Sequence, residues 1–107
     1  IELMEWYIDM FSAVQRARGT HPNTADVPGI NLSFNGSRAE RVPTQGRAID
    51  HIGFEVDNLE AFCEMLEARG ITFQVPYTEI ASIELAIAFF TDPSGVRIEL
   101  TEGFDKY

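Results

Sequence analysis

Two polar residues with the chemistry of metal ligands interrupt segments that otherwise have the pattern of buried strands. His51 lies within "AIDHIGFEV", residues 48–56, and Glu99 lies within "GVRIELTE", residues 95–102. Because side chains alternate between the two faces of a strand, both residues fall on the less apolar face of their segment. If the two strands curve round one cavity, the imidazole nitrogen and the carboxylate can converge on one ion. This nitrogen and oxygen set suits zinc, iron, manganese or nickel.

Each of these residues also has an ordinary structural explanation. A lone histidine beside a core strand is more often hydrogen-bonded structure than a metal ligand, and a single strand glutamate is usually solvated. Glu55 shares the predicted face of His51 and could act as a general base or support the site, with a solvated carboxylate as the alternative. Arg97 could orient an anionic substrate or form a cross-strand ion pair. Three aromatic residues could line the cavity or belong to the core: Tyr77, Phe89 and Phe90.

The surrounding residues predict the elements that must position these side chains. Apolar residues at three- and four-residue spacing predict a helix over residues 2–17, turn-forming residues predict a loop over residues 20–29, and alternation predicts a strand over residues 29–35. A polar stretch with Gly and Pro, residues 36–47, predicts a linker. A strand, a helix and three further strands are predicted after it, over residues 48–56, 58–69, 71–77, 82–91 and 95–101. This order is a complete β-α-β-β-β unit.

The two halves of the chain share one plan. "GINLSF", residues 29–34, and "GVRIEL", residues 95–100, both have glycine followed by apolar residues at the second, fourth and sixth places. The repeat sets Ser33 against Glu99 and places the counterpart of His51 before Ile1. An opening strand that is missing from the first half would leave an unpaired sheet edge. Such an edge is a template for association, so a homodimer is expected.

Length and composition limit the class of protein. A chain of 107 residues, 45% of them hydrophobic, can bury the core of one domain without disulfides or metal staples. Seventeen acidic and eight basic residues give a formal charge of −9, which disfavours nucleic acid and membrane partners. The residues include no apolar run of about 20 and no basic start followed by an apolar stretch that would suggest a signal peptide, so a cytoplasmic location is expected. The single cysteine, Cys63, excludes an internal disulfide and is expected in a helix core.

Three segments together resemble the vicinal oxygen chelate superfamily of glyoxalases, bleomycin- and fosfomycin-resistance proteins, methylmalonyl-CoA epimerases and extradiol dioxygenases. These segments are "DHIGFEV", "NLEAFCEMLEARGITF" and "FFTDPSGVRIELTE", and "EWYIDMF" and "DVPGINLSF" match more loosely. The resemblance implies an α+β fold in which paired β-α-β-β-β modules form a curved mixed sheet round a cleft. It also implies that a divalent metal ion sits in the cleft, with His51 and Glu99 as two of its ligands.

The resemblance and the repeat together predict how the chain is divided. We expect a single domain over residues 1–107, with a partial first module (1–35) that lacks its opening strand, the linker (36–47) and a complete second module (48–107). Ser33 is a weaker ligand than the carboxylate, glutamine or histidine that many relatives place there. His21 lies in the predicted loop, where it is expected to be solvated.

Two functions follow from the resemblance. The first is a metal-dependent lyase, isomerase or dioxygenase that acts on a small molecule through chelated vicinal oxygens. His51 and Glu99 would hold the metal, and Glu99 or Glu55 would be the catalytic carboxylate. The second is a non-catalytic binding or resistance protein that sequesters a small molecule in the same cleft, where the acidic charge would favour a cationic ligand. The pairing of His51 with Glu99 favours the enzyme, and Ser33 favours the binding protein.

Overall fold

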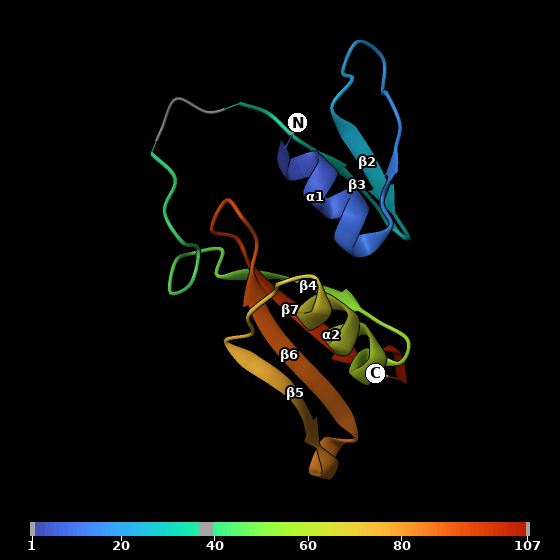
Figure 1. Cartoon of the computed structure of the whole chain (residues 1–107), viewed down its shortest axis with the longest axis vertical. Helices are drawn as coiled ribbons and strands as arrows, with labels where there is room; N and C mark the ends of the chain where they lie inside the picture. Colours follow the sequence, from blue (N-terminus) through green and yellow to red (C-terminus); the bar gives the residue numbers. More distant parts are fainter. Residues whose placement is uncertain (1, 37–39, 107) are drawn as a thin grey trace. The chain divides into compact units, whose positions relative to one another are not determined.

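The computed structural model describes residues 2–36 and 40–106 of the chain (Figure 1). The chain divides into two compact units, Ile1–Glu40 and Arg41–Tyr107, and each unit has its own β-sheet. No helix within the described ranges is both long enough and apolar enough to cross a membrane.

The first unit consists of one helix and a three-stranded antiparallel sheet. Its elements are α1 (Glu2–Phe11), β1 (Val14–Gln15), β2 (Thr24–Val27) and β3 (Ile30–Ser33), with β2 in the middle of the sheet. α1 buries Met4 and Tyr7, and β2 buries Ala25 and Val27. The ring of Tyr7 lies 5.6 Å from the ring of Phe34, centroid to centroid. These residues give the unit a small apolar core of its own.

Two predictions for this unit were wrong. The helix predicted over residues 2–17 ends at Phe11, because Ser12 takes a left-handed φ of 54° and β1 follows. Part of the loop predicted over residues 20–29 is the strand β2, in which three of the four residues are buried. Turn-forming residues flank this short strand on both sides, so its periodicity could not be recognised.

The second unit has the predicted β-α-β-β-β order. Its elements are β4 (His51–Glu55), α2 (Leu59–Ala68), β5 (Val75–Ile80), the 3-10 helix η1 (Ala81–Ile83), β6 (Leu85–Thr91), β7 (Arg97–Glu102) and the 3-10 helix η2 (Phe104–Lys106). The strands are arranged in the order β4-β7-β6-β5, with β4 parallel to β7 and the other pairs antiparallel. The predicted α+β class and the mixed sheet are therefore confirmed.

The helix α2 begins and ends where the sequence predicts. Asn58 is the N-cap, and its side chain accepts a hydrogen bond from Ala61 N at 3.4 Å. The Glu102 carboxylate, from the last strand, accepts hydrogen bonds from Asn58 N and Leu59 N at 3.0 and 2.9 Å. Gly70 follows the helix with a φ of 94°, a conformation that glycine adopts without strain. These contacts join α2 to β7.

The two faces of the second sheet have different surroundings. α2 lies against one face (Figure 1). The buried core on this side consists of residues from the helix and the strands: Leu59, Cys63, Leu66, Ala88, Phe90, Ile98 and Leu100. Alternate residues of β4 and β7 point to the other face, and His51 and Glu99 are among them. The apolar faces predicted from alternation are those that the helix covers.

The end of the stretch predicted as a linker is hydrogen-bonded to the second unit. Thr44 N donates to Gly95 O at 2.9 Å, and the Thr44 hydroxyl donates to Asp50 O at 2.7 Å. Gly46 N donates to the Asp50 carboxylate at 2.5 Å. These bonds form a turn that leads directly into β4. Residues 37–39 of the same stretch lie outside the described residues.

Candidate functional site

The structure brings the predicted ligand pair together. β4 and β7 are neighbours in the sheet, and their register sets Gly53 opposite Glu99 and His51 opposite Arg97. His51 Nε2 lies 3.3 Å from Glu99 Oε1, and the two side chains are 37% and 26% exposed. A single small ligand or ion can therefore contact both side chains.

A third residue, Asp50, contacts the other nitrogen of the same ring. His51 Nδ1 lies 2.9 Å from Asp50 Oδ1. The hydrogen bond from Gly46 N lowers the pKa of Asp50 below its usual value, and the contacts with His51 and Arg97 lower it further. Sequence reasoning missed Asp50, because alternation over the strand predicted at residues 48–56 placed it on the apolar face with Ile52. β4 begins only at His51, and in the turn before it the Asp50 carboxylate lies beside the imidazole ring. Its place directly before His51 was the available signal.

The contacts of the His51 ring are compatible with an ion between Nε2 and the Glu99 carboxylate. A carboxylate only accepts hydrogen bonds, and a neutral imidazole has a single N–H to donate. A neutral ring can therefore satisfy only one of its two carboxylate neighbours, whereas a protonated ring would satisfy both. Two ligand atoms bound to one ion at about 2.1 Å are roughly 3.0–3.4 Å apart at octahedral or tetrahedral angles. The observed separation of 3.3 Å lies in this range.

The described part of the chain places these two candidate ligands together but offers no complete metal cage. Within residues 2–36 and 40–106, no group of three or more His, Cys, Asp and Glu side chains is placed to hold an ion. A bound ion would therefore depend on water, on the small molecule or on a partner chain for its other positions.

Arg97 contacts several residues next to His51. Its guanidinium lies over the ring of Phe89, with Cζ 4.1 Å from the centroid. Arg97 Nε donates to Gln74 Oε1 at 3.1 Å, and Arg97 NH1 lies 3.4 Å from Asp50 Oδ1. The sequence left open an anionic substrate or a cross-strand ion pair, and the structure shows an ion pair with Asp50, the residue directly before β4. Phe89 also meets the His51 ring edge-on, with centroids 5.6 Å apart.

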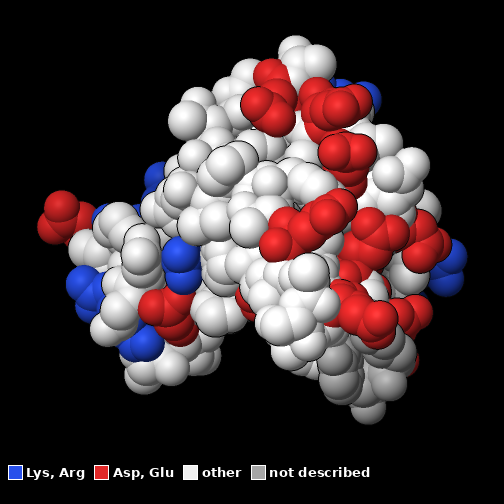
Figure 2. Space-filling model, turned by 90° about the horizontal axis from the view of Figure 1, so that it is seen from below, with Lys and Arg blue, Asp and Glu red and all other residues white. Residues whose placement is uncertain are grey.

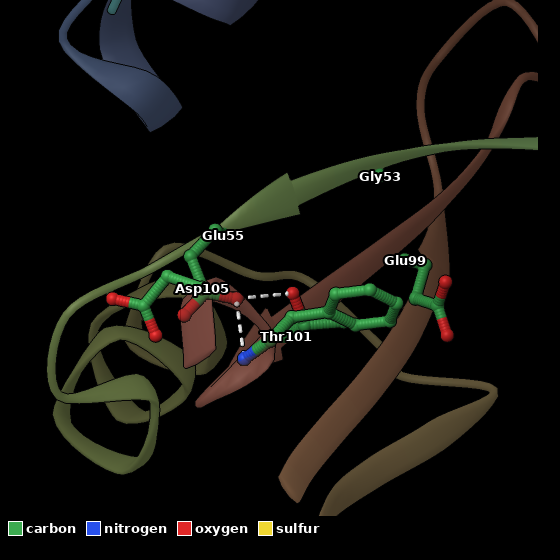
Figure 3. Close-up of a pocket in the computed structure, with 6 residues that line it drawn as sticks. Gly53, Glu55, Glu99, Thr101 and Asp105 are labelled. Carbon is green, nitrogen blue, oxygen red and sulfur yellow. Dashed lines mark hydrogen bonds between the residues drawn. The ribbon is translucent and has the colours of Figure 1, made fainter. Parts of the chain in front are cut away.

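Glu55 lies on the same face of the sheet, at the other end of β4 from His51. Its carboxylate accepts hydrogen bonds from the Thr101 hydroxyl at 2.7 Å, from Gly103 N at 2.8 Å and from Phe104 N at 3.2 Å. Figure 3 shows Glu55 bonded across to β7, with Glu99 farther along that strand. These bonds give the carboxylate a structural role. Its catalytic role, like that of Glu99, stays a prediction.

A hollow of about 390 Å³ lies over this face of β4 and β7. It is lined by Gly53, Glu55, Glu99, Thr101, Phe104 and Asp105. Three of these residues carry carboxylates, and none carries a positive charge (Figure 3). Phe104 is 54% exposed and offers an aromatic surface. The lining suits a small molecule with a cationic or metal-bound part and an apolar part.

The other two aromatic candidates lie elsewhere in the second unit. Phe90 is fully buried in the core under α2. The Tyr77 hydroxyl donates to Glu79 Oε1 at 3.0 Å, and Tyr77 borders a separate hollow near the end of β5. Of the three aromatic residues, Phe89 is therefore the one that contacts His51.

In the first unit, Ser33 and His21 contact each other. The sequence indicated that both are weak candidates for metal ligands. Ser33 Oγ lies 2.9 Å from His21 Nε2. His21 was expected to be a solvated loop residue, and it is only half-buried, but its ring contacts the residue that the repeat equates with Glu99. The neighbouring Asp26 is bonded to Arg18 and Asn31.

Carboxylates dominate the charge of the second unit. Residues 41–107 contain twelve acidic and five basic residues and so carry a formal charge of −7 out of the total of −9. In Figure 2 the Asp and Glu side chains gather over one part of the visible face, with few Lys or Arg residues among them. A surface of this kind attracts cations and repels anionic ligands.

Solved structures with a similar fold come from several bacteria. A glyoxalase family protein from Enterococcus faecalis has a TM-score of 0.73 and 20% identity, over 95% of this chain and 88% of that chain. A glyoxalase/bleomycin resistance protein/dioxygenase from Alicyclobacillus acidocaldarius has a TM-score of 0.67 and 21% identity, over 98% and 83% of the two chains. TioX from Micromonospora sp. ML1 has a TM-score of 0.65 and 19% identity, over 95% and 86%. At these identities the likeness shows a shared fold.

The family assignment comes from the sequence itself. A search of curated proteins gave no match. Residues 4–100 match the family model of the Glyoxalase/Bleomycin resistance protein/Dioxygenase superfamily. This match covers both units of the chain and confirms the resemblance that the sequence motifs indicated. The chain belongs to the Glyoxalase/Bleomycin resistance protein/Dioxygenase superfamily.

Proposed function

We propose that this chain is a metal-dependent enzyme of the glyoxalase and dioxygenase type, which acts on a small molecule through chelated vicinal oxygens. The observation that carries the proposal is the 3.3 Å separation of His51 Nε2 and Glu99 Oε1, on a sheet face that also borders a hollow. The two side chains would hold a divalent ion such as zinc, iron, manganese or nickel. When bound, the ion would supply the positive charge that polarises two neighbouring oxygens of the substrate.

The chain's own residues would bind the substrate and move its proton. The hollow beside Glu99 has room for a small molecule, and the exposed ring of Phe104 can pack on an apolar part of it. The Glu99 carboxylate borders this space and can accept a proton from a ligand bound there. Glu55 is less available for this step, because three hydrogen-bond donors already occupy its oxygens. A lyase, an isomerase and a dioxygenase all fit this arrangement.

Two further features belong to the same proposal. A homodimer would allow a partner chain to complete the coordination sphere, since the described residues supply two ligands. A cytoplasmic location is consistent with a single buried cysteine, whose thiol needs no oxidising compartment. Sedimentation analysis with and without added metal tests the first feature. A chain that stays monomeric when loaded with metal would contradict it.

Elemental analysis of the purified protein tests the metal site. We would compare the wild type with His51→Ala, Glu99→Gln and the control His21→Ala, which removes the other histidine of the chain. The wild type and the control should hold near-stoichiometric metal, whereas both site variants should lose it. Circular dichroism would establish that each variant is folded. Equal metal in His51→Ala and the wild type, or none in the wild type after reconstitution, would contradict the proposal.

A second candidate function is sequestration of a cationic small molecule without an ion. Two observations favour it: the described residues hold no complete metal cage, and Glu55, Glu99 and Asp105 line the hollow together. Titration with a panel of cationic aromatic compounds, with and without EDTA, separates the two functions. Binding that persists unchanged in EDTA supports sequestration. Binding that disappears with the chelator supports the metal-dependent site.

A further inference from the structure

The ring of His51 has a carboxylate at each nitrogen, and the two carboxylates are held differently. We propose that Asp50 is a positioning residue that keeps the ring proton on Nδ1, so that Nε2 presents its lone pair beside Glu99. The proposal rests on the proposed function only in taking Nε2 as the coordinating atom. The placement of the proton itself is a property of the metal-free protein.

The chemistry of the contact requires Nδ1 to be the donor. Asp50 Oδ1 lies 2.9 Å from His51 Nδ1, which is a normal hydrogen-bond distance. A carboxylate has no proton to donate, so the hydrogen bond forms only if Nδ1 carries the hydrogen. In a neutral ring Nε2 is then left with a lone pair. The longer contact, 3.3 Å from Nε2 to Glu99 Oε1, is the one that remains for a ligand.

Asp50 is anchored from several sides. Gly46 N donates to Oδ2 at 2.5 Å, and Arg97 NH1 lies 3.4 Å from Oδ1. The Thr44 hydroxyl donates to the Asp50 carbonyl at 2.7 Å and accepts from Arg97 N at 2.8 Å. The turn before β4 and the first residue of β7 therefore hold this carboxylate in place. Glu99, by contrast, borders the open hollow.

Replacement of Asp50 by asparagine should reverse the tautomer. Gly46 N donates to Oδ2 at 2.5 Å, whereas Arg97 NH1 donates to Oδ1 at 3.4 Å, so the closer donor decides and the carboxamide oxygen of the variant would take the Oδ2 position. The carboxamide NH₂ would then occupy the Oδ1 position and donate to His51 Nδ1. That nitrogen would become an acceptor, and the ring proton would move to Nε2. Nε2–H would point at Glu99, and the proton would have to leave Nε2 before that nitrogen could bind an ion.

Nitrogen NMR of the imidazole ring tests the proposal without any metal. We would record spectra of the metal-free protein in a His21→Ala background, where His51 is the one histidine, at an alkaline pH at which the ring-nitrogen shifts no longer change with pH. The wild-type ring should show a protonated Nδ1 and an unprotonated Nε2, and Asp50→Asn should show the reverse. Asp57→Asn, the same charge change at an exposed position of the same unit, should keep the wild-type pattern.

A metal titration adds a second readout. Zn²⁺ affinity should fall about 10- to 100-fold in Asp50→Asn, the usual effect of removing a group that orients a metal-bound histidine. It should stay within about threefold in Asp57→Asn. An unchanged tautomer in Asp50→Asn would overturn the proposal, and so would a reversed tautomer with undiminished Zn²⁺ affinity. If the wild type binds no Zn²⁺ while the tautomers behave as expected, the proposed function fails and the role of Asp50 in placing the proton stands.

Discussion

Removal of the Glu55 side chain should loosen the C-terminal end of the second unit. The Glu55→Ala variant deprives three donors of their acceptor: the Thr101 hydroxyl, Gly103 N and Phe104 N. Hydrogen bonds to a charged group contribute about 1.5–3 kcal/mol each when they are well shielded from water. Glu55 is exposed, and water can replace it at the two backbone N–H groups, so most of the loss comes from one donor.

The Thr101 hydroxyl determines how much stability the Glu55→Ala variant loses. Thr101 is only 7% exposed, so its hydroxyl is poorly placed to find water when the carboxylate is gone. A buried polar group left without a partner costs about 1–3 kcal/mol. We therefore expect Glu55→Ala to lower the free energy of unfolding by about 2 kcal/mol, a large part of a typical total of about 5–15 kcal/mol.

Urea unfolding followed by far-UV circular dichroism measures this change. With a slope of about 2 kcal/mol per molar urea, the midpoint should fall by about 1 M. Glu64→Ala, which removes an exposed carboxylate from the middle of α2, is the matched control and should unfold like the wild type. In a Thr101→Val background, Glu55→Ala should lower the free energy of unfolding much less, because no buried hydroxyl is then left without an acceptor. A Glu55→Ala midpoint within about 0.2 M of the wild type would refute the reasoning and return Glu55 to the list of candidate bases.

Three further predictions concern the cores and titrating groups. Phe90→Ala, at a fully buried site, should lower the free energy of unfolding by about 3–5 kcal/mol in urea, and a loss below about 1 kcal/mol would show that the site repacks. The hydrogen bond from Asn31, with support from Arg18, holds the pKa of Asp26 below its ordinary value of 3.8. Stability from Asp26 is therefore complete above about pH 4 and is lost as the pH falls through the lowered pKa, so Asp26→Asn should flatten this part of an acid unfolding curve. Burial raises the pKa of the Cys63 thiol to about 11, so Ellman's reagent at about pH 8 should label it in urea but not in the native protein.

Much of the second unit could be predicted because its signals are local. Alternation identified the face of β4 that carries His51, and the cap at Asn58 and the turn at Gly70 identified the ends of α2. The same alternation in the last strand predicted that Glu99 lies on the less apolar face, as His51 does. That the two strands are neighbours came from the resemblance to a known family, since the residues that pair are 46 positions apart.

The parts that escaped prediction depend on distant residues. Asp50 points at His51 because a turn at Gly46 and the side chain of Arg97 hold it there, and no periodicity encodes these contacts. Glu55 owes its structural role to donors 46 to 49 residues away. The strand β2 is short and lies between turn-forming residues, so its burial against α1 was visible only in the folded chain.

The parallel pairing of β4 with β7 also determines when the candidate site can form. The β6–β7 hairpin closes locally, since Thr91 pairs with Arg97, whereas His51 must find Arg97 across 46 residues. Loop closure over the longer span costs about 2 kcal/mol more in chain entropy. During synthesis β4 emerges long before its partner strand. His51 and Glu99 therefore meet only when the last strand of the unit has left the ribosome, and a shortened chain without β7 has no site to assemble.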